Sequence, residues 1–345
     1  MSDGLKIAVV GATGAVGEVL LELLAERVGS AGEVHALASE RSLGKRVSFG
    51  RRELDVADLA EFDFSGVDFA LFSAGASVSR EHAPGAAAAG CTVIDNTSEF
   101  RYREDIPLVV PEVNGDLLDG IGPGAIIANP NCSTIQLVVA VAPIHRAAGI
   151  ERINVATYQS VSGAGRRALE ELARQTADRL NLREIETGVF RQPIAFNVLP
   201  EIDALQDNGY TREEMKLHWE TGKILRDDTV QVNATAVRVP VFFGHSEAVH
   251  LETREAIGIE EARALLQAAP GVVCVEDEGQ GYATAVTHAA GHDPVYVSRL
   301  RRDHTHPRGI DLWIVADNVR KGAALNAVQI LERISGNPLA ARIRA

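Results

Sequence analysis

Short apolar runs alternate with helical segments over the first part of the chain. Leu5–Val10 is a continuous apolar run that ends at a glycine, which is typical of a strand buried on both faces of a parallel sheet. The same pattern predicts strands at Val34–Ala38, Phe69–Ser73, Cys91–Asp95 and Ala125–Ala128, helices at Glu18–Val28 and Val78–Ala89, and a polar hairpin at Lys45–Val56. Pro84 is a candidate interruption of the second helix. This rhythm predicts an α/β, doubly wound domain of the Rossmann type.

The pattern changes after Cys132. Longer strands with alternating polarity appear, which predicts an α+β domain with a mostly antiparallel sheet. The expected strands are Ile153–Val161, Gln231–Val239, Val249–Thr253, Pro294–Arg299 and Trp313–Ala316. The expected helices are Cys132–Ala147, Ala164–Leu180 and Ala323–Ile334. A further helix is expected after Thr211, which forms a capping-box pattern with Glu214. The last helix could return to the first domain. We therefore expect one domain over residues 1–131 and 318–345 and a second over 132–317.

Composition narrows the class of protein. The 345 residues carry 34 Lys plus Arg and 47 Asp plus Glu, a formal net charge of −13. This length exceeds the roughly 250–300 residues at which one core stops growing, which agrees with two domains. The negative charge argues against a nucleic acid or an anionic membrane as a partner, but it permits an anionic small substrate.

The cysteines and the ends of the chain suggest a compartment. Cys91, Cys132 and Cys274 are too few and too scattered for a disulfide framework or a zinc site, so we expect no metal. The N-terminus leads straight into a strand without a targeting pattern, and no window offers the roughly 20 apolar residues of a membrane span. We expect a cytoplasmic protein.

The loop after the first strand fits the pattern G-x-x-G-x-x-G between a strand and a helix. Its members include Gly11, Thr13, Gly14, Ala15, Val16 and Gly17. Glycines permit a tight turn there and let main-chain N–H groups approach a pyrophosphate at the helix N-terminus. The loop therefore predicts dinucleotide binding. The alternative is a glycine-rich turn in a domain without a cofactor.

The end of the second strand bears on the choice of cofactor. It reads Ser39-Glu40-Arg41-Ser42. Glu40 could bind the ribose hydroxyls of NAD, but Arg41 between two hydroxyl side chains better suits the 2′-phosphate of NADP. We favour NADP. The alternative is that these are ordinary surface residues of a loop.

Cys132 is the candidate nucleophile. It lies in Asn129–Thr134, between an apolar strand and an apolar helix, and hence at or beside a helix N-terminus. The helix dipole and the free N–H groups there favour a thiolate and a developing oxyanion. Cys91 and Cys274 lie inside apolar runs, which indicates small buried side chains.

A reactive cysteine needs a base, and His245 is the best candidate, in the turn Phe242–Glu247 between two strands. Its competitor, His250, lies in the following apolar strand, where a packing role is expected. Arg238 on a preceding strand could bind a carboxylate, or could be a solvated strand residue. Glu220 and Lys223 share a helix face and could equally be an ordinary ion pair. One further cation, Arg101, follows a parallel strand at the end where ligands bind.

These residues resemble the aspartate-β-semialdehyde dehydrogenase family. The resemblance covers nearly the whole chain and rests on GATGAVG at 11–17, SEFR at 98–101, NPNCST at 129–134, YQSVSGAG at 158–165, WETGKIL at 219–225, RVPVFFGHSEAVH at 238–250 and DNVRKGAALNAVQI at 317–330. It implies reversible, NADP-dependent reductive dephosphorylation of 4-phospho-L-aspartate to L-aspartate 4-semialdehyde. The pathways implied lead to lysine through diaminopimelate and to threonine, methionine and isoleucine.

The resemblance also implies roles for individual residues. Cys132 would form an acyl-thioester, Gln159 would orient the substrate beside it, and His245 would be the acid/base. The implied binding residues are Arg238 for the α-carboxylate, Glu220 for the amino group, Arg101, Lys223 and Asn131 for phosphate, Ser162 and Gly163 for a cofactor-contacting turn, and Asn318 near the nicotinamide. The first domain would bind NADP, and the second would bind substrate, catalyse and form a homodimer.

Two other functions stay open. An N-acetyl-γ-glutamyl-phosphate reductase would share the fold and a Cys/His pair, but Arg238 and Glu220 suit a free α-amino acid better than an N-acylated one. A protein that binds NADP as a sensor without catalysis would retain the glycine loop. The intact set of Cys132, Gln159 and His245 argues against that interpretation.

Overall fold

The computed structural model describes residues 4–27, 32–275 and 281–336, and the chain forms two compact units. The first unit comprises residues 1–131 and 323–345, and the second comprises residues 132–322. The expected helix end at Val28 and the C-terminal residues 337–345 of the expected first domain lie outside the described residues. The assignment of cofactor binding to residues 1–131 with 318–345, and of catalysis to residues 132–317, remains a prediction.

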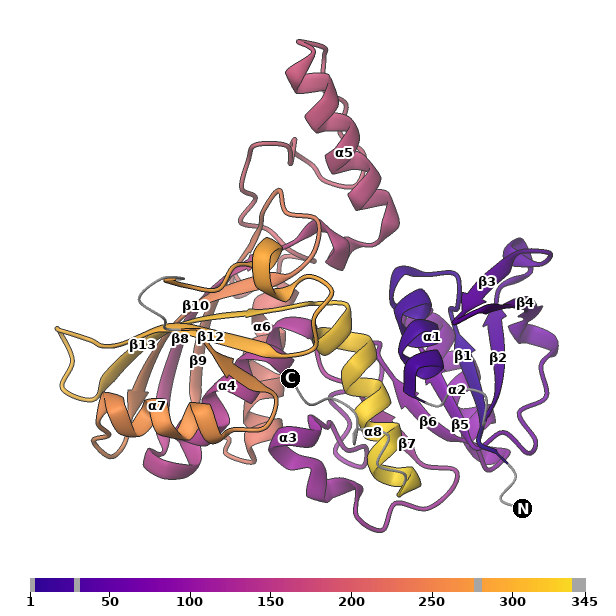
Figure 1. Cartoon of the computed structure of the whole chain (residues 1–345), viewed down its shortest axis with the longest axis horizontal. Helices are drawn as coiled ribbons and strands as arrows, with labels where there is room; N and C mark the ends of the chain where they lie inside the picture. Colours follow the sequence, from indigo (N-terminus) through magenta and orange to yellow (C-terminus); the bar gives the residue numbers. More distant parts are fainter. Residues whose placement is uncertain (1–3, 28–31, 276–280, 337–345) are drawn as a thin grey trace. The chain divides into compact units, whose positions relative to one another are not determined.

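A seven-stranded sheet forms the centre of the first unit, with the order β3-β4-β2-β1-β5-β6-β7 (Figure 1). The strands are β1 (Lys6–Val10), β2 (Glu33–Ala38), β3 (Arg46–Phe49), β4 (Arg52–Asp58), β5 (Phe69–Phe72), β6 (Thr92–Asp95) and β7 (Ile126–Ala128). All neighbours are parallel except β3 and β4, which form the expected hairpin. The central strand β1 is buried along Ile7–Val10, as its apolar sequence predicts. The Rossmann-type prediction is confirmed.

Helices cover this sheet. They are α1 (Ala15–Arg27), α2 (Ala76–Ala88), α3 (Pro111–Asn114) and α8 (Leu325–Ser335), with short turns η2 (Glu40–Ser42), η3 (Leu59–Glu61) and η4 (Gly115–Leu118). The C-terminal helix α8 packs on α1, where Arg27 and Glu332 form a buried ion pair at 2.9 Å. The candidate interruption at Pro84 is wrong, because α2 continues through it with its alanine face packed on β6.

A six-stranded sheet forms the second unit, with the order β11-β12-β13-β10-β8-β9. The strands are β8 (Ile150–Gln159), β9 (Gln231–Arg238), β10 (His245–Thr253), β11 (Val272–Cys274), β12 (Val295–Arg302) and β13 (Gly309–Ala316). The pairs β8–β10, β10–β13 and β12–β13 are antiparallel, and the outer pairs β8–β9 and β11–β12 are parallel. The sheet is mostly antiparallel, as predicted.

The helices of the second unit are α4 (Cys132–Ala148), α5 (Arg166–Leu180), α6 (Arg212–Leu225) and α7 (Ile259–Ala268), with the short segments η5 (Val161–Ala164) and η6 (Ala285–Ala289). The π-helical segment η7 (Arg320–Ala324) begins in this unit and ends in the first. The apolar helix α4 packs on the sheet and against α6 and α7, which also contact the sheet, whereas α5 projects away from it (Figure 1). The predicted capping box of Thr211 and Glu214 is present at the start of α6. Across residues 4–27, 32–275 and 281–336, none of the helices has the length and apolar character to cross a membrane.

Candidate active site

One edge of the six-stranded sheet collects the candidate catalytic side chains. Gln159 ends β8 and Arg238 ends β9, and the two residues are register partners because these strands run parallel. His245 begins β10, which runs antiparallel to β8, so it lies at the same edge. The sequence placed His245 in the turn before this strand; the structure corrects this to the first strand position, directly after Gly244. Strand direction therefore brings these three side chains together.

The last strand adds Asn318 to this edge. It follows β13, whose Ala316 pairs with His245. The Asn318 side-chain oxygen accepts hydrogen bonds from Gly244 N at 2.9 Å, Ser160 Oγ at 3.0 Å and Ser162 Oγ at 3.0 Å. Gly244 has φ +87°, a conformation that glycine adopts without strain. In this structure Asn318 thus holds the turn from which His245 projects.

Buried polar contacts surround His245, which is 0% exposed. Its Nδ1 accepts from Ser160 N at 3.1 Å, and its Nε2 lies 3.4 Å from the side-chain nitrogen of Gln159. Burial, together with the positive charge of Arg238, lowers the pKa of His245 to about 3. The ring is therefore neutral near pH 7.

Arg238 is also buried, with 6% of its surface exposed. Its Nη1 donates to the carbonyl oxygen of Ser160 at 2.7 Å. Burial lowers the pKa of this guanidinium, against the opposing charges of Glu213 and Cys132. Gly163 keeps space open beside it, because a Cβ there would stand 3.1 Å from Arg238 Nη1 and 3.5 Å from His245 Nε2. A carboxylate of a substrate suits this position.

Glu213 is a site residue that the sequence analysis missed. Its Oε1 accepts from Gln159 Nε2 at 3.0 Å, and its Oε2 accepts from Lys216 Nζ at 2.9 Å. Burial alone would raise the pKa of this carboxyl, but Lys216, Gln159 and Arg238 outweigh it and hold the pKa at about 2. Lys216 also contacts Asp203 at 2.8 Å. A permanent negative charge therefore lies beside Gln159 and Arg238.

The predicted acid and cation, Glu220 and Lys223, lie on the same helix α6, seven residues beyond Glu213 and Lys216. Two E-x-x-K repeats thus occupy one helix face, about two turns apart. The capping box fixes the first repeat at the helix start, and Glu214 also accepts from Ala236 N of β9 at 2.9 Å. The repetition is the sequence signal that could have pointed to Glu213.

Cys132 is the first residue of α4 and is partly exposed. The negative charge of its thiolate favours the charged form of Arg238 and raises the pKa of that guanidinium, against the effect of burial. The thiol and the guanidinium therefore interact electrostatically. Gly322 packs directly against it, since a Cβ at Gly322 would stand 2.8 Å from Cys132 Cβ. The helix N-terminus, the polar neighbours and the partial exposure suit a nucleophilic thiol. In contrast, burial raises the pKa of the Cys91 thiol to about 12 and raises that of Cys274.

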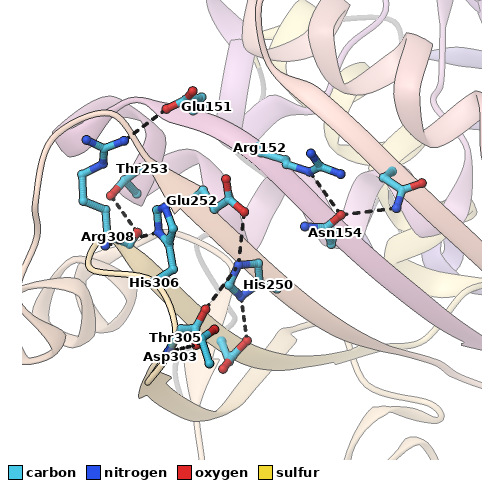
Figure 2. A network of polar contacts seen from close by, with 12 residues as sticks. Glu151, Arg152, Asn154, His250, Glu252, Thr253, Asp303, Thr305, His306 and Arg308 are labelled. Carbon is cyan, nitrogen blue, oxygen red and sulfur yellow. Dashed lines mark hydrogen bonds and ion pairs between the residues drawn. The ribbon is translucent and has the colours of Figure 1, made fainter.

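The competing histidine has a different environment. His250 lies five positions after His245 on β10 and hence on the opposite face of the strand. Figure 2 shows its ring close to Glu252 and Asp303. Nδ1 of the ring lies 3.0 Å from Asp311, and Nε2 lies 3.6 Å from Glu252 and 3.7 Å from Asp303. The sequence predicts a packing role with the polar atoms of the ring satisfied, and the ring does have partners, which are carboxylates at a partly exposed position. His250 is a polar residue of the outer sheet face.

The dinucleotide loop lies in the first unit beside a cavity of about 670 Å³. The predicted residues that line it are Gly11, Thr13, Gly14, Ser39, Arg41 and Ser42. Ala15, Val16 and Gly17 form the first turn of α1, where a Cβ at Gly17 would collide with the carbonyl oxygen of Gly11. The glycine spacing is thus required by close main-chain approach, and the N–H groups of the helix start adjoin the cavity.

The predicted phosphate-site residues belong to different units. Arg101 follows β6 in the first unit, is buried, and donates to Asn96 O at 2.8 Å. Asn131 is the last residue of that segment and directly precedes Cys132. Lys223 lies on α6 of the second unit. Their common role remains a prediction.

Comparisons with known proteins give the family. Residues 6–121 match the family model described as "Semialdehyde dehydrogenase, NAD binding domain", and residues 141–321 match "Semialdehyde dehydrogenase, dimerisation domain". The chain is 60% identical to an aspartate-semialdehyde dehydrogenase of Legionella pneumophila over 96% of each chain.

Solved structures agree with this relationship. A crystal structure of aspartate semialdehyde dehydrogenase II complexed with ASA from Vibrio cholerae has a TM-score of 0.93 and 53% identity, and covers 98% of this chain and 100% of that chain. An aspartate semialdehyde dehydrogenase with NADP from Candida albicans has a TM-score of 0.75 and 25% identity, over 96% of this chain and 99% of that chain. The chain belongs to the aspartate-semialdehyde dehydrogenase family.

Proposed function

We propose that this protein is an NADP-dependent aspartate-semialdehyde dehydrogenase. It catalyses reversible reductive dephosphorylation of 4-phospho-L-aspartate to L-aspartate 4-semialdehyde and phosphate, in the biosynthesis of lysine, threonine, methionine and isoleucine. The observation that carries this proposal is the 60% identity to the Legionella enzyme over 96% of both chains. The cluster of Cys132, Gln159, Arg238 and His245 in one unit supports it.

The charges in the second unit fit an α-amino acid. Arg238 binds the α-carboxylate through its guanidinium, a pairing that can be bidentate. Glu220, which is 0% exposed on α6, is the proposed partner of the α-ammonium group. Glu213 accepts from the Gln159 side chain and so fixes it in position. Gln159 then lies between the binding groups and His245.

Cys132 performs the covalent step. Its thiolate attacks the carbonyl carbon of the acyl phosphate, the carbon–oxygen bond to phosphate breaks, and inorganic phosphate leaves behind an acyl-thioester. NADPH, when bound, supplies the hydride that reduces this thioester. His245 exchanges a proton with the oxygen of the resulting thiohemiacetal, which expels the thiolate and releases the aldehyde. Arg101, Asn131 and Lys223 are the proposed phosphate ligands.

The cavity of the first unit is the proposed NADP site. Main-chain N–H groups of the loop Gly11–Gly17 would hold the pyrophosphate, and Ser39, Arg41 and Ser42 would hold the 2′-phosphate. The Candida relative, whose crystal structure is one with NADP, supports this choice of cofactor. Ser162 and Gly163 form a turn that is proposed to contact the cofactor, and Asn318 is the proposed residue near the nicotinamide.

Two further properties follow from membership of the family. The match of residues 141–321 to the dimerisation domain supports a homodimer. We place the enzyme in the cytoplasm, a reducing compartment in which a catalytic thiol such as Cys132 stays reduced.

The test follows NADPH formation from aspartate semialdehyde, phosphate and NADP, with Cys132→Ala as the inactive control. Phosphate-dependent NADPH formation by the unchanged protein alone is the expected result. Activity only with N-acetylglutamate semialdehyde would refute the substrate assignment. Binding of NADP without turnover of either aldehyde would refute catalysis and indicate a sensor.

A further inference from the structure

Lys216 lies near the start of α6 and has two carboxylate partners. Its Nζ lies 2.9 Å from Glu213 Oε2, three residues earlier on the helix, and 2.8 Å from Asp203 Oδ2, in the segment before the helix. The side chains of Lys216 and Glu213 are 12% and 6% exposed, whereas that of Asp203 is 37% exposed. Asp203 therefore anchors the ammonium group near the surface, while Glu213 meets it in the interior.

The other oxygen of Glu213 fixes the amide of Gln159. Glu213 Oε1 accepts from Gln159 Nε2 at 3.0 Å, and Gln159 Oε1 accepts from Thr157 Oγ1 at 3.1 Å. The Thr157 hydroxyl can donate or accept, so it selects neither orientation of the amide. An ionised carboxylate can only accept and selects the amide nitrogen, whereas a protonated carboxyl could also donate to the amide oxygen. The orientation of Gln159 therefore depends on the charge of Glu213.

The orientation of this amide decides which group Gln159 presents to a substrate. The amide nitrogen carries two hydrogens, and Glu213 accepts one of them. The nitrogen also lies 3.4 Å from His245 Nε2, so we expect its second hydrogen to serve an acceptor oxygen that binds beside His245. An amide turned the other way would place its own oxygen there and repel that acceptor.

Several influences act on the charge of Glu213. Burial raises the pKa of this carboxyl, and Lys216 is the strongest of the groups that lower it, ahead of the Gln159 amide and Arg238 of β9. Without Lys216, burial would be opposed only by Gln159 and Arg238, and the pKa of Glu213 would rise. The other titratable groups that act on Glu213 or its partners are Asp203 before α6, His245 of β10 and, through Arg238, Cys132 of α4.

We propose that Lys216 is a positioning residue: it keeps the Glu213 carboxylate charged and in place, and this carboxylate orients the Gln159 amide for the substrate. Asp203 anchors Lys216 in this arrangement. The first part, the charge of Glu213, concerns the unliganded protein. The second part, the effect on turnover, rests on the proposed function. Lys216 itself does not contact the reacting atoms in this scheme.

The charge of Glu213 is tested without turnover, by urea denaturation over a pH series. Glu213→Gln is compared with the unchanged protein, and the same substitution is compared with Lys216→Met alone. With Lys216 present, the pKa of Glu213 is about 2 in the folded protein and 4.5 in the unfolded chain, so its stabilising contribution is lost as the pH falls through this interval. Lys216→Met should remove this loss. An equal pH dependence in the two comparisons would overturn the first part.

The orientation of Gln159 is tested by the pH profile of kcat for NADPH formation from aspartate semialdehyde. Lys216→Met should show an acid limb that the unchanged enzyme lacks, with an inflection between about pH 5 and pH 8, the range of buried carboxyls without a cation. Below the inflection kcat should fall about tenfold to a hundredfold, the effect of one hydrogen bond to a charged oxygen. Lys216→Arg keeps the charge and should restore the original profile. Addition of Glu213→Gln to Lys216→Met should abolish the limb, because an amide does not titrate.

Arg27→Met is the matched control, because Arg27 forms an ion pair with Glu332 in the first unit and both side chains are 8% exposed. It should lower stability without adding an acid limb. A Lys216→Met enzyme with the profile of this control would overturn the second part, as would a limb that persists with Glu213→Gln. Lys216→Gln, which keeps an N–H donor, replaces Lys216→Met in both tests if that variant does not fold. If the unchanged protein does not oxidise aspartate semialdehyde, the proposed function and the second part are refuted together, and the urea series still decides the first.

Discussion

Replacement of Gly322 by alanine tests whether the position of Cys132 depends on close main-chain packing. Gly322 lies in η7, and an added Cβ would stand 2.8 Å from Cys132 Cβ and 3.2 Å from Cys132 Cα. Carbon atoms in contact prefer about 3.5–4.0 Å. The two segments must therefore separate by several tenths of an ångström to about 1 Å.

The displacement cannot be absorbed by a flexible side chain. The atoms too close to the added Cβ are the Cα and Cβ of Cys132, so the first turn of α4 must move. The sulfur of Cys132 moves with it. A misplacement of about 1 Å at a reacting group can cost about a hundredfold in rate. Overpacking of this kind destabilises a protein by about 1–3 kcal/mol. We expect Gly322→Ala to remain folded but to lose about a hundredfold in kcat.

The assay measures phosphate-dependent NADPH formation, together with urea denaturation and the rate of Cys132 alkylation. Gly85→Ala is the control, because Gly85 lies within α2 and its Cβ would meet nothing within 4 Å. This control should keep full activity and gain about 0.5–1 kcal/mol, as alanine does in a helix. A Gly322→Ala enzyme with wild-type kcat and alkylation rate would refute the packing argument.

Three other substitutions test the charges of the second unit. Glu220→Gln should lower kcat/KM about tenfold to a hundredfold by weakening the proposed amino-group contact, and an unchanged kcat/KM would contradict that assignment. Burial raises the pKa of Glu247 well above its ordinary value of 4.5, so the folded protein binds the carboxyl proton more tightly than the unfolded chain does. The free energy of unfolding therefore falls as the pH rises above 4.5, the pKa of this carboxyl in the unfolded chain. Glu247→Gln should remove this decline in urea denaturation series. The effect of His245 on stability has the opposite sign, because its pKa is about 3 in the folded protein and 6.5 in the unfolded chain. The free energy of unfolding therefore decreases as the pH falls from 6.5 to about 3, and His245→Asn should reduce this decrease in the same urea series.

The first unit was largely predictable because its strands report their environment in their composition. A run such as Phe69–Phe72 is buried at every position, so a continuous apolar sequence can belong only to a strand covered on both faces. The helix α7 was missed. It is short, begins after Gly258 without a side-chain cap, and buries only Ala262 and Leu266. Such a segment lacks the start signals from which helices are predicted.

The role of Glu213 could not be predicted from the sequence. Glu213 and Glu220 are separated by seven residues, which is close to two helical turns, so each lies on the same face with a lysine three residues later. Periodicity alone treats the two repeats as equivalent. The contact of Glu213 with Gln159 of β8 is tertiary and lies beyond periodicity, as does the hydrogen bond by which Glu214 ties the helix start to Ala236.

The order of charges in the second unit explains why a free amino acid fits this site. Lys216 lies between Asp203 and Glu213, and Glu213 in turn acts on Arg238, so charges alternate in sign from the exposed Asp203 to the buried Glu213 and Arg238. A buried charge is costly unless an opposite charge accompanies it. The α-carboxylate of a substrate would pair with Arg238, and its α-ammonium group with the buried acid Glu220. An N-acylated substrate lacks the positive charge, and would place a neutral amide against Glu220 instead. We therefore expect discrimination against it even though Cys132, Gln159 and His245 could act on both.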